Sequence, residues 1–206
     1  LNYSFTCVHD NKQAMVMEYV DRNLRQHLDS VGMLNKQSFL EIAGGIADGL
    51  AYIHDLNMVH RDIKTDNILV HLSMTGKSVP KICDFGIARD VPEQWTRMRI
   101  IGSYPYMAPE LLVPERPAMT TRGDDDAVEE RWKQLAKLEP RIDTWSFGCV
   151  AWEILTGLVP FGGCYQVTLP TMVARGQMSL PLPPQTSVES LQNMLKRCLQ
   201  TKPENR

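Results

Sequence analysis

The sequence lacks several features that would place the protein in a specialised class. It has 206 residues with 22 Lys and Arg against 24 Asp and Glu, a net charge of −2, so the basic excess of a nucleic-acid-binding surface is missing. The five cysteines form no CxxC pair, and their odd number is typical of reduced thiols rather than of a disulfide framework. We therefore expect no nucleic-acid partner and a cytoplasmic location.

Long hydrophobic runs are also missing. The longest candidate, Phe147–Leu155, is interrupted by Glu153 and is shorter than the roughly 18 residues that a membrane span needs. The first ten residues, LNYSFTCVHD, have no basic region followed by an apolar one, as a signal peptide would. They also lack an initiator methionine. We expect a fragment of a longer protein, with no membrane span in this segment; attachment to a membrane receptor outside it stays compatible with the sequence.

The patterns that are present predict a mainly helical α+β domain. Hydrophobic residues make up 43% of the chain, enough for a sizeable core. Residues 14–20, AMVMEYV, favour a buried strand. Apolar residues recur at steps of three and four from about 35 to 55, which predicts an amphipathic helix with Asn35 as its N-cap. Short strands over 67–71 and 79–83 would form a hairpin-like pair.

The second half of the chain adds three expectations. Residues 143–156 are apolar nearly all round, which predicts a helix at the centre of the domain that stops at Gly157. Thr186 and Glu189 form a T-x-x-E capping box for a last helix. Residues 114–140 look like an insertion that contains a short helix of its own.

The most informative stretch is HRDIKTDNILV, residues 60–70, where a run of chargeable and amide side chains ends in an apolar triplet. Such a run indicates polar groups that are fixed against a core. Two further motifs follow in order, KICDFGIAR at 81–89 and GSYPYMAPE at 102–110. D-F-G alone is a common tripeptide and A-P-E alone is weak. Together with H-R-D-x-K-x-x-N upstream, they form the signature set of protein kinases.

On these motifs the chain resembles a eukaryotic-type protein kinase of the Ser/Thr type, with the tyrosine-kinase-like group as a compatible subgroup, over essentially its whole length. The resemblance implies a protein-kinase-like fold: residues 1–20 as the end of the N-lobe and hinge, and 21–206 as a mainly helical C-lobe. Within the C-lobe, 84–110 would be the activation segment. Only the last two strands of the N-lobe would be present. The family's glycine-rich loop, its phosphate-binding lysine and the partner glutamate of that lysine are missing, which we interpret as truncation.

The resemblance also assigns chemistry to individual residues. Asp62 would receive the proton of the acceptor hydroxyl, and Lys64 would reach the transferring phosphate. Asn67 and Asp84 would be the two Mg²⁺ ligands, a hard amide oxygen and a hard carboxylate. With Lys64, Asn67 and Asp84, the ATP site would include Met17 at its back, the backbone of Glu18 and Val20 at the adenine edge, and Leu69 as its floor.

Further residues match supporting positions of the family. His60 and Phe85 would belong to its stacked apolar spine. Asp143 would hold backbone N–H groups of the catalytic loop, which is the H-R-D-x-K-x-x-N motif at 60–67. Glu110 and Arg206 would form an ion pair. Thr96 is the best candidate for regulatory phosphorylation, weighed equally against an exposed threonine without such a role.

The sequence thus predicts a kinase that transfers the γ-phosphate of ATP to Ser or Thr hydroxyls of protein substrates, with ATP and Mg²⁺ as cofactors. The alternative is a pseudokinase, scaffold or inactive fragment that only binds partners. Intact Asp62, Lys64, Asn67 and Asp84 argue against that alternative. A small-molecule kinase is disfavoured by GSYPYMAPE, which resembles the peptide-positioning segment of protein kinases.

Overall fold

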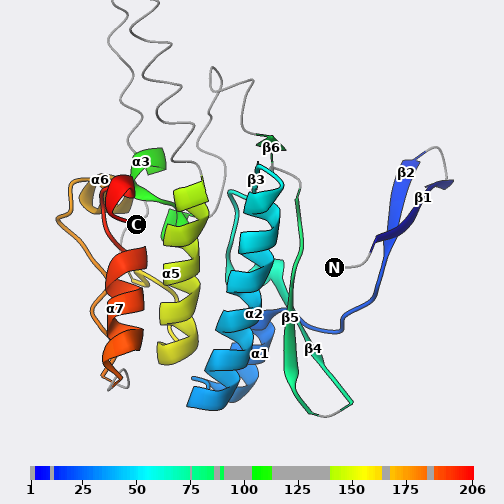
Figure 1. The fold of residues 1–206 in the computed structure, drawn as a ribbon, viewed down its shortest axis with the longest axis horizontal. Helices are drawn as coiled ribbons and strands as arrows, with labels where there is room; N and C mark the ends of the chain where they lie inside the picture. Colours follow the sequence, from blue (N-terminus) through cyan, green and yellow to red (C-terminus); the bar gives the residue numbers. More distant parts are fainter. Residues whose placement is uncertain are drawn as a thin grey trace, which may run out of the picture.

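The computed structural model describes residues 3–9, 12–74, 76–85, 89–90, 104–112, 140–163, 168–184 and 188–206 (Figure 1). This part of the chain is a bundle of helices with three two-stranded antiparallel strand pairs. The expected α+β, mainly helical class is therefore confirmed. Thr96 and the helix predicted within 114–140 lie outside the described residues. Of the range 114–140, the structure describes Pro140, the first residue of a later helix.

The N-terminal strands form a hairpin that stands to one side of the helices in Figure 1. Strand β1 (Tyr3–His9) pairs antiparallel with β2 (Lys12–Met17). The expectation of a buried strand over 14–20 is wrong at its C-terminal end. The strand ends at Met17, which is 43% exposed, and Tyr19 is 87% exposed. The reason is that, among the strands that the structure describes, β2 pairs with β1 alone and then continues as an extended connection towards the helices.

Two helices follow this connection, and both begin at asparagine caps. Helix α1 (Leu24–Val31) has a capping box between Asn23 and Gln26. Helix α2 (Lys36–Asp55) starts as predicted at Asn35, whose side chain accepts a hydrogen bond from Ser38 N at 2.9 Å. Its buried stripe is the one that the sequence predicted: Phe39, Ile42, Ile46, Leu50 and Ile53.

The second strand pair is the predicted hairpin. Strand β4 (Ile68–Leu72) pairs antiparallel with β5 (Ser78–Ile82), so that Leu69 faces Lys81 across the ladder. The hairpin packs against α2 at Gly45, where a Cβ atom would lie 2.6 Å from Cγ of Pro80. A side chain at residue 45 would force the two elements apart. The close packing places the strand that leads to Asp84 directly on α2.

The remaining helices form the other side of the molecule. Helix α5 (Pro140–Thr156) is buried on nearly all sides, as predicted, and Gly157 ends it with φ of 72°. It lies between α2 and α7 (Glu189–Cys198) in Figure 1, and it packs on both. Short helices α3 (Pro109–Leu112) and α6 (Leu169–Ala174) pack together, and the 3₁₀ helix η4 (Pro203–Asn205) ends the chain.

One local prediction fails in this region. Helix α7 begins at Glu189 with Val188 as an N-cap that makes no side-chain hydrogen bond. Glu189 is therefore the first helical residue, whereas a capping box with Thr186 would make it the third. Thr186 itself lies outside the described residues. Among the helices that the structure describes, none combines the length and apolar character that crossing a membrane requires.

Candidate active site

The loop that carries the H-R-D motif is anchored to the buried helix α5. It follows the short strand β3 (Met58–Val59), which pairs with β6 (Arg89–Asp90). The backbone N–H groups of His60 and Arg61 donate to the two carboxylate oxygens of Asp143, each at 2.8 Å. Asp143 is fully buried and also contacts His54 Nε2 at 2.9 Å. These donors offset the desolvation of the carboxylate, and the contact expected of Asp143 is confirmed.

The imidazole of His60 links this loop to the strand before Asp84. Its Nε2 lies 3.0 Å from the carbonyl oxygen of Cys83, and its Nδ1 accepts from Asp62 N at 3.3 Å. The pattern assigns the proton to Nε2, because a carbonyl only accepts. The ring also meets Phe85 edge to face, with ring centroids 4.8 Å apart. The structure thus brings the two expected spine residues together.

Asp62, Lys64 and Asn67 converge on one carboxylate oxygen. Lys64 Nζ donates to Asp62 Oδ2 at 2.8 Å, and Asn67 Nδ2 donates to the same oxygen at 2.9 Å. Nδ2 also donates to the main-chain oxygen of Asp62 at 2.9 Å. Asp62 is nearly buried, with a side-chain exposure of 13%, so these charge-assisted bonds hold its orientation firmly. The geometry matches a carboxylate fixed for proton transfer.

Asn67 lies beside the residue that precedes Asp84. It ends the 3₁₀ helix η1 (Thr65–Asn67), and its main-chain oxygen accepts from Cys83 N at 2.9 Å. Asp84 comes next and has a φ of 63°. For a residue with a Cβ, this left-handed conformation is unfavourable by about 1–2 kcal/mol. Such strain in a polar loop is more common at functional sites.

The side chains of Asn67 and Asp84 fit a hard divalent cation. Both hydrogen bonds of the Asn67 side chain use its nitrogen, which leaves the amide oxygen available to a metal. Magnesium is usually held by one or two protein carboxylates together with phosphate oxygens and water. In the part of the chain that the structure describes, no three His, Cys, Asp or Glu side chains gather into a metal site.

The residues expected around adenine are brought together only in part. Lys81, the ladder partner of Leu69, forms an ion pair with Glu18, which places the connection after β2 beside the β4–β5 hairpin. Val20 is half-buried on the same connection. Met17, by contrast, is exposed at the end of β2. Its place at the back of a nucleotide pocket stays a prediction.

A buried polar cluster next to the catalytic loop was not predicted. Its centre is Glu153 of α5, which pairs with Arg25 of α1. Tyr106 Oη donates to Glu153 Oε2 at 2.6 Å, and Thr65 Oγ1 lies 3.3 Å from each carboxylate oxygen. Burial raises the pKa of Glu153 and of Tyr106 above their usual values, although the donors around Glu153 oppose its shift. The only sequence signal was a glutamate inside an apolar helix.

The expected ion pair at the end of the chain is present. Arg206, whose side chain is fully buried, pairs with Glu110 of α3 and donates to the carbonyl oxygen of Arg141 at 2.9 Å. Its guanidinium carbon lies 5.5 Å from the ring centroid of Trp145. Burial raises the pKa of Glu110, while Arg206 acts in the opposite direction. The contact ties α3, and with it the preceding segment, to α5 and η4.

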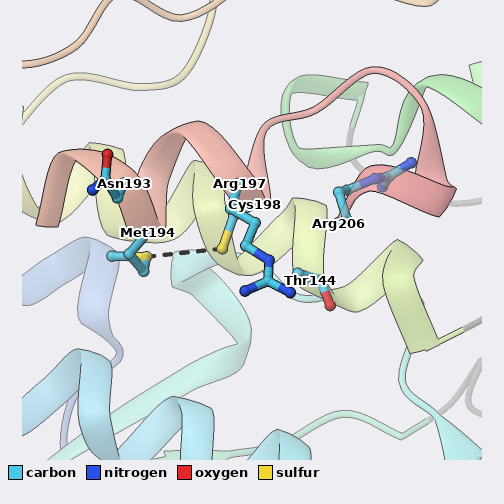
Figure 2. A pocket seen from close by; sticks show the side chains of 6 residues that line it. All are labelled: Thr144, Asn193, Met194, Arg197, Cys198 and Arg206. Carbon is cyan, nitrogen blue, oxygen red and sulfur yellow. Dashed lines mark hydrogen bonds between the residues drawn. The ribbon is translucent and has the colours of Figure 1, made fainter. Parts of the chain in front are cut away.

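The hollow in Figure 2 is separate from this site. It has a volume of about 400 Å³ and lies between α5 and α7. Neither the catalytic loop nor Asp84 contributes to its lining, which consists of Thr144, Asn193, Met194, Arg197, Cys198 and Arg206.

The chain is similar in sequence to known protein kinases. Mitogen-activated protein kinase kinase kinase 13 of Homo sapiens is 29% identical over 193 residues, which is 93% of this chain and 17% of that protein. Serine/threonine-protein kinase RAD53 of Saccharomyces cerevisiae is 31% identical over 195 residues, 93% of this chain and 22% of that protein. Mitogen-activated protein kinase kinase kinase 12 of Rattus norvegicus is 31% identical over 162 residues, 79% of this chain and 15% of that protein.

The chain thus spans between 15% and 22% of the length of these curated relatives. The profile of the protein kinase domain matches residues 2–206, which include the catalytic loop, the strand before Asp84 and the Glu110–Arg206 pair. By this match, the chain belongs to the protein kinase domain family.

Proposed function

We propose that this chain is the catalytic part of a protein serine/threonine kinase, which transfers the γ-phosphate of ATP to hydroxyl groups of protein substrates. The observation that carries the proposal is the fixed Asp62 carboxylate, which Lys64 and Asn67 hold through Oδ2 on a loop anchored to α5. Phosphoryl transfer depends mainly on positioning and charge, and this loop supplies both.

We assign the second carboxylate oxygen of Asp62 to the reaction. Lys64 and Asn67 donate to Oδ2, and no described residue donates to Oδ1. In the proposed mechanism, Oδ1 accepts the proton of the acceptor hydroxyl while the hydroxyl oxygen attacks the γ-phosphorus and ADP leaves. The ammonium of Lys64 lies next to this carboxylate and stabilises the negative charge of the transferring phosphate.

Asn67 and Asp84 would hold Mg²⁺ through their side-chain oxygens. When bound, the ion neutralises charge on the phosphate oxygens. Leu69 would lie under adenine, with the backbone of Glu18 and Val20 at its edge. The Glu18–Lys81 ion pair supports this placement, because Lys81 faces Leu69 in the ladder.

We also propose that the chain is one part of a longer protein in which further residues complete the phosphate site. The support is the greater length of the relatives. A cytoplasmic location is proposed as well, and the free thiols of Cys7, Cys83, Cys149 and Cys198 support it.

The choice of serine and threonine as acceptors rests on Lys64 and on a relative that is named a serine/threonine kinase. A peptide library with Ser, Thr or Tyr as the single acceptor, incubated with the full-length protein and ATP–Mg²⁺, tests it. We expect phosphate on Ser and Thr. Dominant tyrosine phosphorylation would refute the acceptor choice, and tight nucleotide binding without any transfer would favour a non-catalytic binding protein.

A further inference from the structure

The polar cluster around Glu153 joins the catalytic loop to three other parts of the fold. Arg25 comes from α1, Thr65 from η1, Tyr106 from the 3₁₀ helix η3 (Tyr104–Tyr106), and Glu153 from the last turn of α5. Glu153 is fully buried, as is Thr65. A carboxylate in such a place needs donors, and the other three side chains provide them.

Thr65 is the member of this cluster that belongs to the catalytic loop. It directly follows Lys64 and opens the tight turn that ends at Asn67, where Asn67 N donates to Lys64 O at 3.0 Å. A shift of the Thr65 backbone would therefore move Lys64 and Asn67 together. Both side chains set the position of Asp62 Oδ2.

Tyr106 lies on the opposite side of the cluster and connects it to α5. Its carbonyl oxygen accepts from Ser146 Oγ at 2.8 Å, and its hydroxyl donates to Glu153. The hydroxyl groups of Thr65 and Tyr106 lie 3.2 Å apart. Tyr106 belongs to the motif GSYPYMAPE, which resembles the peptide-positioning segment of protein kinases. Thr65 thus lies where the catalytic loop and that segment meet.

The hydroxyl of Thr65, rather than its volume, makes this connection. Tyr106 donates its proton to Glu153 at 2.6 Å, so the single proton of Thr65 is shared between the two carboxylate oxygens at 3.3 Å each. Valine would fill the same space and keep the β-branch, but it would leave the loop without a hydrogen bond to Glu153. Serine would keep that bond.

We propose that Thr65 is a positioning residue. Its hydroxyl holds Lys64 and Asn67 at a fixed position relative to the peptide-positioning segment at Tyr106. This inference rests on the proposed kinase function, because it concerns the same site. It predicts a defect in turnover and in use of the peptide that is larger than any defect in ATP binding.

The test compares Thr65→Val with Thr65→Ser in the full-length protein. Thr156→Val is the matched control, because Thr156 makes two hydrogen bonds at the end of α5 without touching the catalytic loop. For each variant, kcat, the KM values for peptide and ATP, and the melting temperature are measured. Hydrogen exchange of backbone amides in 60–67 and 104–108 is measured in parallel, since this readout does not require activity.

We expect Thr65→Val to lower kcat about tenfold and to raise the KM for peptide, because small displacements of reacting groups reduce rates steeply. Its loop amides should exchange faster than in the wild type, and Thr65→Ser should restore both properties. Thr156→Val should lower the melting temperature and leave the kinetic constants unchanged. If Thr65→Val does not fold, Thr65→Ala also removes the hydroxyl and should give the same pattern, again with Thr65→Ser as the variant that restores the wild-type properties.

Wild-type kinetics in Thr65→Val would overturn the proposal, as would a defect in Thr65→Ser as large as that in Thr65→Val. Unchanged exchange in 60–67 would also overturn it. A wild-type protein without transferase activity would instead refute the proposed function, and loop exchange in Thr65→Val and Thr65→Ser would then decide by itself whether the hydroxyl positions the loop.

Discussion

At the scale of single residues, Asn67 serves two purposes in the proposed mechanism. Its amide nitrogen donates to both the side chain and the main chain of Asp62, which leaves its amide oxygen for the proposed Mg²⁺ ion. One side chain therefore couples the position of the base to metal binding. Aspartate at this place could not donate to Asp62 and would add a like charge beside it.

Replacing Asn67 by alanine should therefore affect Mg²⁺ use most strongly. We expect the Mg²⁺ concentration for half-maximal activity to rise about 10- to 100-fold, the range typical when a group that supports a metal site is lost. Titration of activity with Mg²⁺ at saturating ATP measures the effect. Asn193→Ala on the exposed side of α7 is the control. If Asn67→Ala shows the same Mg²⁺ dependence as the wild type, Asn67 is not a metal ligand.

The cysteines differ strongly in their surroundings, and this predicts their reactivity. Burial raises the pKa of Cys198 to about 11 and raises that of Cys149 still further, whereas Cys7 is exposed on β1. A raised pKa lowers the thiolate fraction at pH 8, and the thiolate is the reactive form. Iodoacetamide should therefore alkylate Cys7 in the native protein and spare Cys149 and Cys198 until the protein is unfolded.

Mass spectrometry after timed labelling resolves the three sites. Alkylation of Cys149 at the rate of Cys7 under native conditions would show that α5 is not buried as described.

At the scale of elements, the close contact between α2 and the β4–β5 hairpin depends on one glycine. A Cβ at Gly45 would lie 2.6 Å from Pro80, whereas a Cβ at Gly44 would meet nothing within 4 Å. Gly44→Ala should stabilise the helix by up to about 1 kcal/mol. Gly45→Ala should destabilise the protein by about 1–3 kcal/mol, because overpacking would push the hairpin away.

Urea unfolding of the two variants gives the comparison directly, since both changes are glycine to alanine at neighbouring helical positions. Equal effects of the same sign would contradict the packing of α2 on β5.

The same elements show what the sequence could and could not predict. The spacing of apolar residues and the capping residue were sufficient to predict α2, because its buried stripe and the Asn35 cap are local signals. The hairpin was predictable for the same reason. The capping box at α7 was wrong, because the pattern T-x-x-E does not reveal where the first helical turn begins. The prediction of a buried strand over 14–20 was wrong at its C-terminal end, because an apolar composition does not reveal how many strands cover the segment.

The site was predictable where the residues that contact one another belong to a single motif. Asp62, Lys64 and Asn67 lie within six residues, and their resemblance to kinases located them together. The contacts of Asp143 and of Glu110 with Arg206 were also expected from that resemblance. The Glu153 cluster was not predicted, because its hydrogen-bonded pairs lie between 41 and 128 residues apart and share no motif. Only the fold brings them into contact.

At the scale of the whole molecule, α5 is the element on which the site is built. Asp143 near its beginning holds the catalytic loop, and Glu153 near its end connects that loop to Tyr106 and Arg25. The β4–β5 hairpin then joins the loop to the strand before Asp84 (Figure 1). The central claim is that this scaffold fixes Asp62 as the proton acceptor for phosphoryl transfer.

The most direct test is Asp62→Asn in the full-length protein, with phosphate transfer and nucleotide affinity measured on the same preparations. Asp55→Asn, an exposed carboxylate at the end of α2, is the matched control. We predict that Asp62→Asn lowers the transfer rate about 10²- to 10⁴-fold, the usual contribution of a general base, while calorimetry shows unchanged nucleotide binding. The control should behave as the wild type. Turnover in Asp62→Asn equal to that of the wild type would contradict the account.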